Sequence, residues 1–232
     1  MEEFLYSNFD SARNERKFYI THLEHNSILD IIRMHPAAFS EIFEQRSINN
    51  IYFDTASKHN YLDNVNGLSR RIKIRVRWYG DLFGRIEKPM LEFKIKDNTY
   101  NTKIAFPLNP FTLNGHLSLE YLQNILQLSD VPEFIRVQMR GFQFGLLNRY
   151  NRRYFLSMDR NFRITTDINL EAFRLHPSNN SFLHHNIERD ATILELKYEK
   201  SQNEFVDQIT RFFPFRMTRS SKYVAGIDAV GF

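Results

Sequence analysis

The sequence predicts an α+β protein in which an antiparallel, β-barrel-like sheet of about eight strands surrounds a tunnel, with helices packed outside. Three observations lead to this prediction. Most segments alternate apolar and polar residues with the period of a strand, aromatic residues make up 15% of the chain with 22 Phe and 11 Tyr, and one face of several strands is cationic. With 8 Gly and 7 Pro the chain is not linker-rich, and we find no repeat and no domain boundary. We therefore expect residues 1–232 to form a single domain.

The composition excludes several classes of site. The chain has no cysteine, which rules out disulfides, thiolate zinc sites and cysteine nucleophiles. The 31 basic residues only slightly outnumber the 27 acidic ones, but 21 of the 31 are arginine. Because the guanidinium group presents a planar fork of donors that suits phosphate and carboxylate oxygens, this bias indicates an anionic partner.

The amino-terminal segment lacks the features of a secretory signal, since Glu2 and Glu3 stand where positive charge is expected and no apolar core follows them. No stretch approaches the roughly 20 apolar residues that span a bilayer. We therefore expect a cytoplasmic protein without a transmembrane segment, for which a partner protein supplies any contact with a membrane. The oligomeric state is left open.

Periodicity and turn residues define the expected elements. A helix is expected over 24–34, where apolar residues have helical spacing and the pattern stops before Pro36. A second helical stretch, over 117–140, is interrupted at Pro132. The polar stretch 176–189 is expected to be a mobile loop. The remaining expected elements are strands at 13–21, 46–54, 69–79, 86–96, 100–106 and 192–200, two strands within 141–170 that meet near 159–161, helices at 57–65 and 203–213, and a final segment at 220–230.

The residues that alternate with the apolar ones are the most informative feature. In the segment 71–78 the apolar phase is Ile72, Ile74, Val76 and Trp78, and the opposite phase is Arg71, Lys73, Arg75 and Arg77. The same phase is basic in other strands, and across the set it holds Lys17, Lys73, Arg75, Arg77, Lys94, Lys96, Arg152, Arg163 and Lys197.

For any one strand, the alternative is an ordinary solvated face. Such a face mixes neutral polar residues with both signs of charge, however, and like charges directly across a sheet destabilise it. A repeated cationic phase is explained if the sheet curls so that this face lines a concave surface and a bound polyanion removes the repulsion. The pattern therefore predicts a basic tunnel.

Three glutamates, Glu15, Glu92 and Glu195, interrupt the cationic phase. Each could be an ion-pair partner of the basic residues or a ligand for a hard divalent cation. Mg²⁺ and Mn²⁺ prefer oxygen ligands and commonly use one or two carboxylates together with substrate phosphates. We favour Glu195 as the metal ligand because it lies between apolar neighbours in a strand.

Eight short segments are distributed along nearly the whole chain: Arg-Asn-Glu-Arg-Lys-Phe (13–18), Ile-Tyr-Phe-Asp-Thr (51–55), Lys-Ile-Arg-Val-Arg-Trp-Tyr-Gly (73–80), Leu-Glu-Phe-Lys (91–94), Tyr-Asn-Arg (150–152), Phe-Arg-Ile-Thr-Thr-Asp (162–167), Ile-Leu-Glu-Leu-Lys-Tyr (193–198) and Ser-Lys-Tyr (221–223). Together, and in this order, they resemble the polyphosphate polymerase (VTC) domain. This family is a branch of the triphosphate tunnel metalloenzymes, which are related to CYTH domains.

The resemblance implies a tunnel of antiparallel strands that binds ATP and a growing polyphosphate chain, with Mn²⁺ or Mg²⁺ as cofactor. It implies catalytic phosphate contacts for Arg75, Arg77, Lys94, Arg152 and Arg163, and substrate contacts for Lys17, Tyr150, Ser221 and Lys222, the last two at the start of the last helix. Glu195 matches the metal-binding glutamate of the family. No role is implied for Lys96 or Lys197.

One position departs from the wider superfamily, whose triphosphatases and cyclases begin with two glutamates and a lysine in alternation. Here Arg13 stands in the place of the first glutamate. This departure favours the VTC branch over simple triphosphate hydrolysis.

Three functions remain open from the sequence: a polyphosphate polymerase, a metal-dependent triphosphatase or tripolyphosphatase that uses water as the acceptor, and a non-catalytic polyphosphate-binding module. Nucleic-acid binding ranks low because the cations follow strand phase and no nucleic-acid motif is present. The sequence contains no P-loop and no Rossmann fingerprint. The eight histidines form no pair at ligand spacing, and we expect them to have structural or surface roles.

Overall fold

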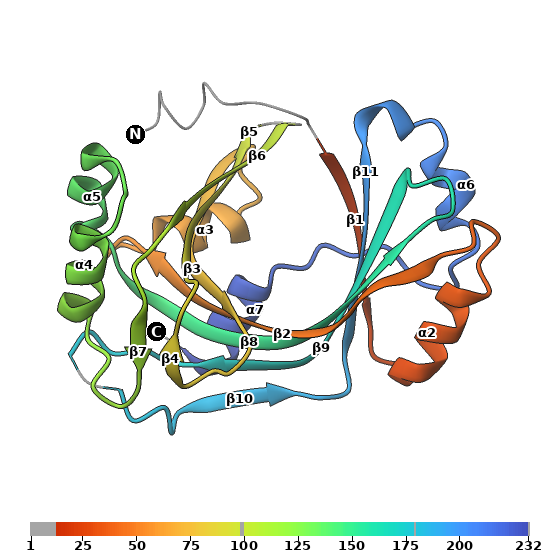
Figure 1. Ribbon diagram of the computed structural model, residues 1–232. Helices are drawn as coiled ribbons and strands as arrows, with labels where there is room; N and C mark the ends of the chain where they lie inside the picture. The colour runs from red at the N-terminus through yellow and green to blue at the C-terminus, as the bar shows by residue number, and fades with distance from the viewer. Residues whose placement is uncertain (1–12, 98–99, 179, 232) are drawn as a thin grey trace.

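The computed structural model describes residues 13–97, 100–178 and 180–231 (Figure 1). Within these ranges, nine strands form one antiparallel sheet in the order β1-β11-β9-β8-β2-β3-β5-β6, with β10 beside β9. The strands of this sheet are β1 (Arg13–Ile20), β2 (Ser40–Asp54), β3 (Arg70–Tyr79), β5 (Met90–Asp97), β6 (Tyr100–Pro107), β8 (Gln143–Leu156), β9 (Phe162–Phe173), β10 (His185–Glu188) and β11 (Thr192–Glu199). The short strands β4 (Gly84–Ile86) and β7 (Phe111–Leu113) pair with each other.

The large sheet curls into a tunnel-like wall that does not close into a hydrogen-bonded ring. Its two edge strands, β1 and β6, approach each other at the top of Figure 1, but no ladder joins them among the residues described. The free edge of β1 is partly covered by the segment before the last helix, where the Thr218 N–H donates to the Lys17 carbonyl at 2.8 Å. The predicted barrel-like sheet is therefore present, with a seam between its first and last strands.

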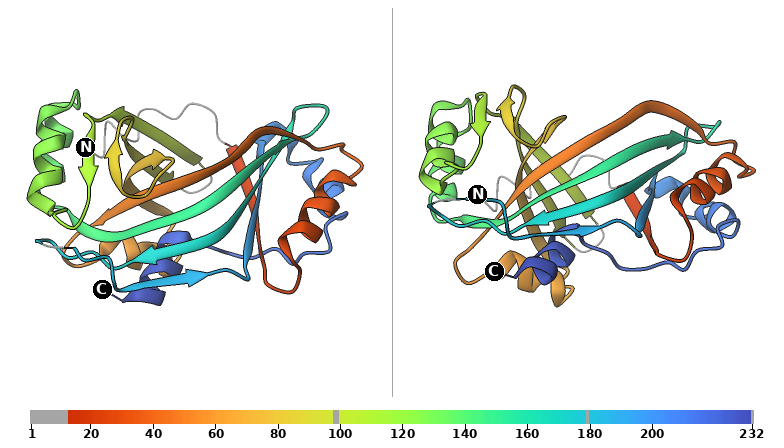
Figure 2. Two further views of the ribbon diagram at one scale, coloured as in Figure 1. Left: turned by 60° about the horizontal axis from the view of Figure 1, so that its bottom comes forward. Right: turned by 90° about the horizontal axis from the view of Figure 1, so that it is seen from below.

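Two pairs of helices cover the convex side at opposite ends of the sheet (Figure 2). Helices α4 (Leu119–Leu128) and α5 (Glu133–Met139) pack onto the apolar phase of β3 and β5, where Leu122 and Ile135 join Ile74, Val76 and Phe93 in one buried cluster. At the other end, α2 (His25–Arg33) and α6 (Val206–Thr210) complete a second cluster, in which Ile28, Ile32 and Val206 join Phe18 and Leu194. Burial of the apolar phase fixes the cationic phase on the opposite, concave face.

The last helix, α7 (Lys222–Val230), lies on the concave face and forms the floor of the tunnel. Ile227 packs with Leu146 of β8, and Gly226 allows this close approach, since a Cβ atom there would lie 2.4 Å from the Leu146 side chain. The Ser221 hydroxyl caps the helix by accepting a hydrogen bond from the Val224 N–H at 3.4 Å.

One buried carboxylate, Asp54 at the end of β2, joins α7 to the short helix α3 (His59–Val65). It accepts hydrogen bonds from the backbone N–H groups of Asn60 and Tyr61, each at 2.9 Å. These N–H groups lie in the first turn of α3, where no partner within the helix is available to them. It also accepts a hydrogen bond from the Tyr223 hydroxyl at 2.6 Å. Asp54 thereby fixes the first turn of α7 against the end of β2.

Most of the expected elements are present, and four differ. The strand expected at 46–54 begins at Ser40, and the strand expected over 86–96 is divided into β4 and β5 around Pro89, which has no N–H to donate to a ladder. The helix expected over 203–213 is confined to α6, after a 3₁₀ turn at Lys200–Gln202. The expectation of a loop throughout 176–189 was wrong, because β10 pairs with β9 as an additional strand.

In the described part of the chain, none of the helices has the length and hydropathy needed to span a lipid bilayer.

Candidate functional site

The concave face holds a cavity of about 460 Å³ whose wall is strongly cationic. Nine basic side chains line it against two carboxylates, Glu15 and Glu195. The basic residues are Lys17, Lys73, Arg75, Arg77, Lys94, Lys103, Arg152, Lys197 and Lys222. They come from six strands and from α7, so the curled sheet gathers charges that are distant in the sequence.

The alternation of side chains along each strand places the cations on the face that lines the cavity. On β3, Lys73, Arg75 and Arg77 face the cavity, while Ile74 and Val76 are buried in the apolar cluster on the other face. The antiparallel register then sets Lys94 of β5 directly opposite Lys73, and Glu92 opposite Arg75. The wall therefore follows from the period of the strands and from their register.

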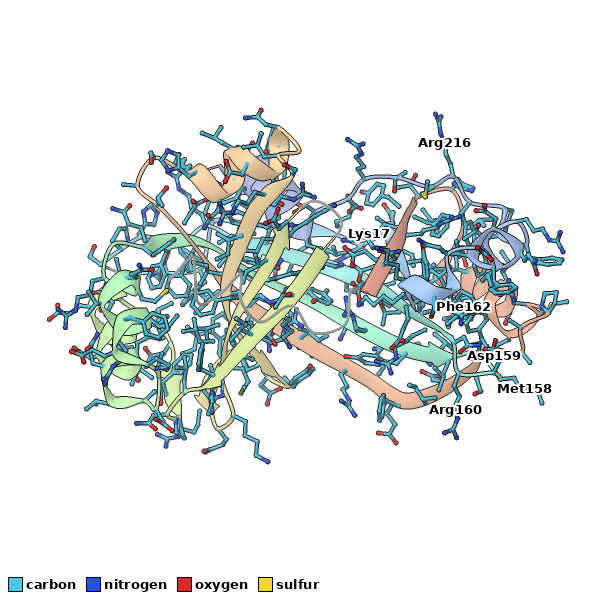
Figure 3. The ribbon with its side chains drawn as sticks, turned by 90° about the horizontal axis from the view of Figure 1, so that it is seen from above. Lys17, Met158, Asp159, Arg160, Phe162 and Arg216 are labelled. Atoms are coloured by element: carbon cyan, nitrogen blue, oxygen red, sulfur yellow. The ribbon has the colours of Figure 1, made fainter. Side chains whose placement is uncertain are left out.

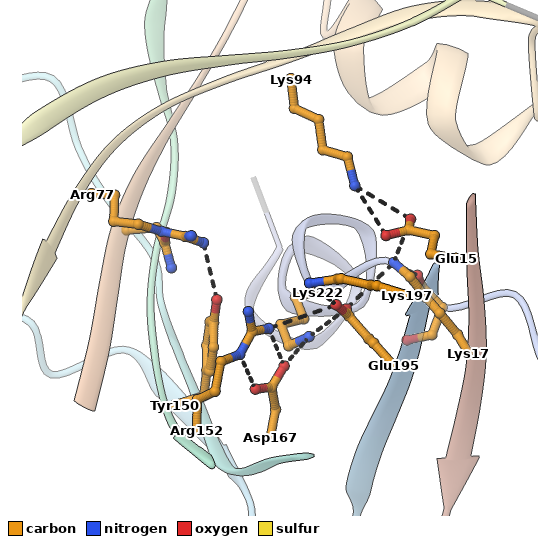
Figure 4. A network of polar contacts seen from close by, with 12 residues as sticks. Glu15, Lys17, Arg77, Lys94, Tyr150, Arg152, Asp167, Glu195, Lys197 and Lys222 are labelled. Carbon is orange, nitrogen blue, oxygen red and sulfur yellow. Dashed lines mark hydrogen bonds and ion pairs between the residues drawn. The ribbon is translucent and has the colours of Figure 1, made fainter. Parts of the chain in front are cut away.

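The floor of the cavity contains a buried cluster centred on Asp167 of β9 (Figure 4). The Arg152 guanidinium donates to both oxygens of Asp167, from Nε at 2.5 Å and from Nη2 at 2.6 Å. The Lys222 ammonium lies 2.5 Å from Asp167 Oδ2, and the Asp167 side chain has no exposed surface. Burial raises the pKa of Asp167, but Arg152 and Lys222 outweigh it and hold the pKa below its usual value. Asp167 thus fixes two cations that come from β8 and α7.

Glu195 of β11 lies beside this cluster and is surrounded by cations (Figure 4). Its carboxylate oxygens lie 3.1 Å from Lys197 Nζ, 3.2 Å from Lys222 Nζ, 3.5 Å from Lys17 Nζ and 3.8 Å from Arg152 Nη2. Burial raises the pKa of Glu195, yet Lys222, Lys17 and Lys197 together hold it well below the usual range for glutamate. Glu195 is therefore ionised and is an available oxygen ligand for a cation.

A third buried carboxylate of the site, Glu92 of β5, orients Arg75 of β3. Arg75 donates to Glu92 Oε2 from Nε at 2.9 Å and from Nη2 at 2.7 Å, and Lys103 Nζ lies 2.5 Å from Oε1. Arg77 instead donates from Nη2 to the Tyr150 hydroxyl at 3.0 Å and from Nε to Asn50 Oδ1 at 2.8 Å. These contacts hold both guanidinium groups in fixed orientations at the cavity wall.

Glu15 of β1 spans the seam of the sheet. Both of its oxygens accept hydrogen bonds from the Lys94 ammonium on β5 at 3.3 Å, and Lys17 Nζ lies 3.3 Å from Oε1. Burial raises the pKa of Glu15, but the attraction of Lys94 and Lys17 outweighs burial and lowers the pKa to about 2. For Lys94, burial is the largest effect and lowers its pKa to about 8 in spite of Glu15.

Lys73 has no carboxylate within ion-pair distance among the described residues. Its ammonium donates to the Ser221 hydroxyl at 2.8 Å. Burial, together with repulsion from Lys17 and Lys94, lowers its pKa well below the usual value. A phosphate in the cavity would supply the missing negative charge.

The carboxylates fit a divalent cation only in part. No group of three His, Asp or Glu side chains within residues 13–97, 100–178 and 180–231 is placed to hold a metal ion. Glu15 and Glu195 nevertheless both lie within 3.5 Å of the Lys17 ammonium, so the two carboxylates contact the same cation. Such a donor set fits Mg²⁺ or Mn²⁺ when phosphate oxygens complete the coordination shell.

Nine of the ten residues singled out from the sequence line this cavity. The exception is Arg163, which is exposed and lies opposite Lys197 in the ladder between β9 and β11, outside the cavity wall. The roles assigned to the nine residues remain predictions, and Arg163 can contact only an anion that reaches beyond the wall.

Sequence reasoning did not single out Asp167, Lys103 or Tyr52, although each belongs to the site. Asp167 shares the phase of Arg163 on one strand, but its importance depends on Arg152 and Lys222, which reach it from other elements. Tyr52 stacks on Tyr223 with ring centroids 4.9 Å apart and accepts a hydrogen bond from Arg75 at 3.2 Å. Strand phase was the only available signal for Lys103 and Tyr52.

The lowered pKa values of Lys94 and Lys73 predict a pH-dependent affinity for anions. Below about pH 8 Lys94 is charged, and as the pH rises through 8 the empty cavity loses this charge, so that binding an anion then requires proton uptake. We expect the affinity for tripolyphosphate, measured by calorimetry, to fall between pH 7 and pH 9. The Lys73→Arg/Lys94→Arg variant keeps both charges and should lose much less affinity; a parallel loss in both proteins would contradict the assignment.

Comparisons with known proteins agree with this fold. A family model described as the VTC domain matches residues 12–230. A search of curated proteins found no match.

Solved structures resemble the chain over most of its length. A protein from Pyrococcus horikoshii is 13% identical with a TM-score of 0.53, and the alignment covers 93% of this chain and 98% of that one. A candidate adenylyl cyclase from Hippeastrum, described as having a dominant triphosphatase activity, is 13% identical with a TM-score of 0.52, and the alignment covers 92% and 94%. A conserved protein from Pyrococcus furiosus is 10% identical with a TM-score of 0.51, covering 91% and 99%. These likenesses concern the fold, and they confirm the predicted class.

Proposed function

Because this chain belongs to the VTC domain family, we propose that it is a phosphotransferase that moves the terminal phosphate of ATP to a growing polyphosphate chain and releases ADP. The observation that carries the proposal is the cavity wall, in which nine cations face two carboxylates. Glu92 and Asp167 pair with some of these cations from behind the wall, yet the basic residues still outnumber all four carboxylates, and this excess suits an anion with several phosphates.

The arginines and lysines bind and orient the phosphates. Arg75 and Arg152 are each held at two nitrogen atoms by a buried carboxylate, so their orientation is set before substrate arrives. Preorganised donors of this kind stabilise the charge that develops on phosphate oxygens without having to reorganise during the reaction. Lys73, which has no ion-pair partner among the described residues, gains an anionic partner when phosphate enters.

No side-chain nucleophile or general base is required for this transfer. The acceptor is a phosphate oxygen that already carries negative charge, so its attack on the terminal phosphorus releases no proton. In agreement with this chemistry, none of the lining residues in the described part of the chain is a histidine. The protein's task is to align donor and acceptor and to neutralise their mutual repulsion.

Mn²⁺ or Mg²⁺ is the cofactor we propose, with Glu195 as its ligand and Glu15, which shares the Lys17 ammonium with Glu195, as a second carboxylate. Bound together with phosphate oxygens, the metal ion would neutralise negative charge and polarise the phosphoryl group as a Lewis acid. The lowered pKa of Glu195, in which Lys222, Lys17 and Lys197 outweigh burial, keeps this ligand ionised at neutral pH.

The Glu195→Gln variant tests the metal assignment. We expect it to bind Mn²⁺ at least about tenfold more weakly in the presence of tripolyphosphate, because a neutral amide replaces the anionic ligand, and to lose most of its turnover. Manganese binding can be followed by electron paramagnetic resonance, and turnover by ADP release. Glu188→Gln on β10, which lies outside the cavity, is the matched control. Metal binding and metal dependence that stay intact in Glu195→Gln would show that the metal ligand is another group.

Incubation of the purified chain with ATP and Mn²⁺ tests the reaction itself. We expect ADP release together with long phosphate chains on a polyacrylamide gel. Orthophosphate as the only phosphate product would instead indicate a triphosphatase with water as the acceptor. Tight binding of tripolyphosphate without turnover would indicate a polyphosphate-binding module.

A further inference from the structure

The cationic face of the sheet continues beyond the cavity along β3 and β5. Lys73 and Lys94 are direct cross-strand partners that line the cavity. The next pair with the same phase is Arg71 and Lys96, which are also cross-strand partners but lie outside the cavity wall. Two residues along a strand correspond to about 6–7 Å, so this second pair extends the row of positive charge past the cavity.

No ion pair within the described residues neutralises this outer pair. No ion pair joins Arg71 or Lys96 to a carboxylate of residues 13–97, 100–178 or 180–231; Arg71 donates instead to the Leu68 carbonyl at 2.5 Å. Apart from Glu15, the charges that act on Lys96 are cationic and include Arg71 and Arg219. Like charges directly across a sheet are destabilising, so two such pairs in succession are a cost to the folded protein.

A ligand would remove this cost. Both side chains are partly exposed, which leaves their remaining N–H groups accessible. A triphosphate confined to the cavity would leave Arg71 and Lys96 unneutralised, whereas a longer linear anion that leaves the cavity along β3 and β5 would pass between them.

We propose that Arg71 and Lys96 form an outer anion subsite, which binds the phosphates of a linear polyanion that extends beyond the cavity. Its identification with polyphosphate rests on the proposed function. The subsite should favour long phosphate chains over tripolyphosphate, because only a long chain can occupy the cavity and contact the outer pair at the same time.

The Arg71→Gln/Lys96→Gln variant tests this subsite by calorimetry with two probes, tripolyphosphate and polyphosphate of defined length above 20 units. We expect the variant to bind the long chain about tenfold more weakly and to bind tripolyphosphate within about twofold of the unaltered protein. The effect should shrink as salt is raised, because both side chains are partly exposed to solvent. The variant should also shift the polymer made from ATP toward shorter chains.

The control removes one arginine and one lysine from exposed positions outside the cavity, as Arg216→Gln/Lys88→Gln. Arg216 points into solvent away from the tunnel (Figure 3). Equal loss of long-chain affinity in the two double variants would overturn the subsite and indicate a general effect of net charge. An equal loss for both probes in Arg71→Gln/Lys96→Gln would also overturn it, since it would place the pair within the triphosphate site.

The two proposals fail separately. If the protein makes no polymer but Arg71→Gln/Lys96→Gln still binds long chains selectively more weakly, the phosphotransferase proposal fails and the subsite stands. If polymer forms and its length and affinity are unchanged in the variant, the subsite fails and the phosphotransferase proposal stands.

Discussion

Arg152→Gln is expected to lower the rate of phosphate transfer by about 100- to 1000-fold, the usual cost of removing one preorganised donor to developing charge. It should also destabilise the fold by about 3 kcal/mol, because Asp167 then remains buried with Lys222 as its remaining ion-pair partner among the described residues. Turnover is measured by ADP release, and stability by urea unfolding.

The double variant Arg152→Gln/Asp167→Asn separates the two effects. It removes the uncompensated carboxylate together with the guanidinium, so we expect most of the lost stability to return while turnover stays low. Recovery of both properties would mean that Arg152 serves only to neutralise Asp167. Asp167→Asn alone should retain phosphate binding but change the turnover number more than KM, since Arg152 would keep its charge and lose its fixed orientation.

Asp54→Ala is expected to lower the free energy of unfolding by about 3 kcal/mol. The substitution leaves the N–H groups of Asn60 and Tyr61 and the Tyr223 hydroxyl without their acceptor at a buried position, and it removes the contact that fixes α7. Because Lys222 and Ser221 lie next to Tyr223, affinity for tripolyphosphate should fall as well. Urea unfolding and calorimetry measure the two effects.

A matched control is available on the surface of α7. The exposed Asp228 carboxylate accepts a hydrogen bond from the Tyr61 hydroxyl at 2.6 Å, so Asp228→Ala also removes an aspartate contact between α3 and α7. We expect it to cost less than about 0.5 kcal/mol, because exposed groups find water as a replacement partner. Similar losses in the two variants would indicate that Asp54 is no more important than an ordinary surface contact.

Strand phase made much of the fold and of the cavity wall predictable. An apolar phase such as Ile74, Val76 and Trp78 must be buried, and this requirement alone places Arg75 and Arg77 on the opposite face. Glu195 could be placed in the same way, from its apolar neighbours on β11. These inferences need only the two-residue period, which does not depend on which strands are neighbours.

The parts that were missed depend on how strands are arranged in three dimensions. Arg163 has the inward phase and lies directly opposite Lys197, which lines the cavity, yet Arg163 itself is exposed and does not line it. Asp167 becomes important only because Arg152 of β8 and Lys222 of α7 meet it. The pairing of β10 with β9 could not be foreseen from the polar composition of 176–189, since an edge strand needs few apolar residues.

The pairing of the first described strand with the last one has a consequence for the folding pathway. β1 pairs with β11, so Lys17 lies directly opposite Glu195, although the two residues are near opposite ends of the sequence. Pairing between such distant segments carries a high entropic cost of loop closure and is characteristic of slow-folding topologies. During synthesis, the wall around Glu195 cannot be assembled until β11 has left the ribosome, so a nascent chain that ends before Thr192 lacks the Lys17–Glu195 contact. The cavity wall is therefore assembled late in folding, and an anion that binds it would stabilise only the fully assembled sheet.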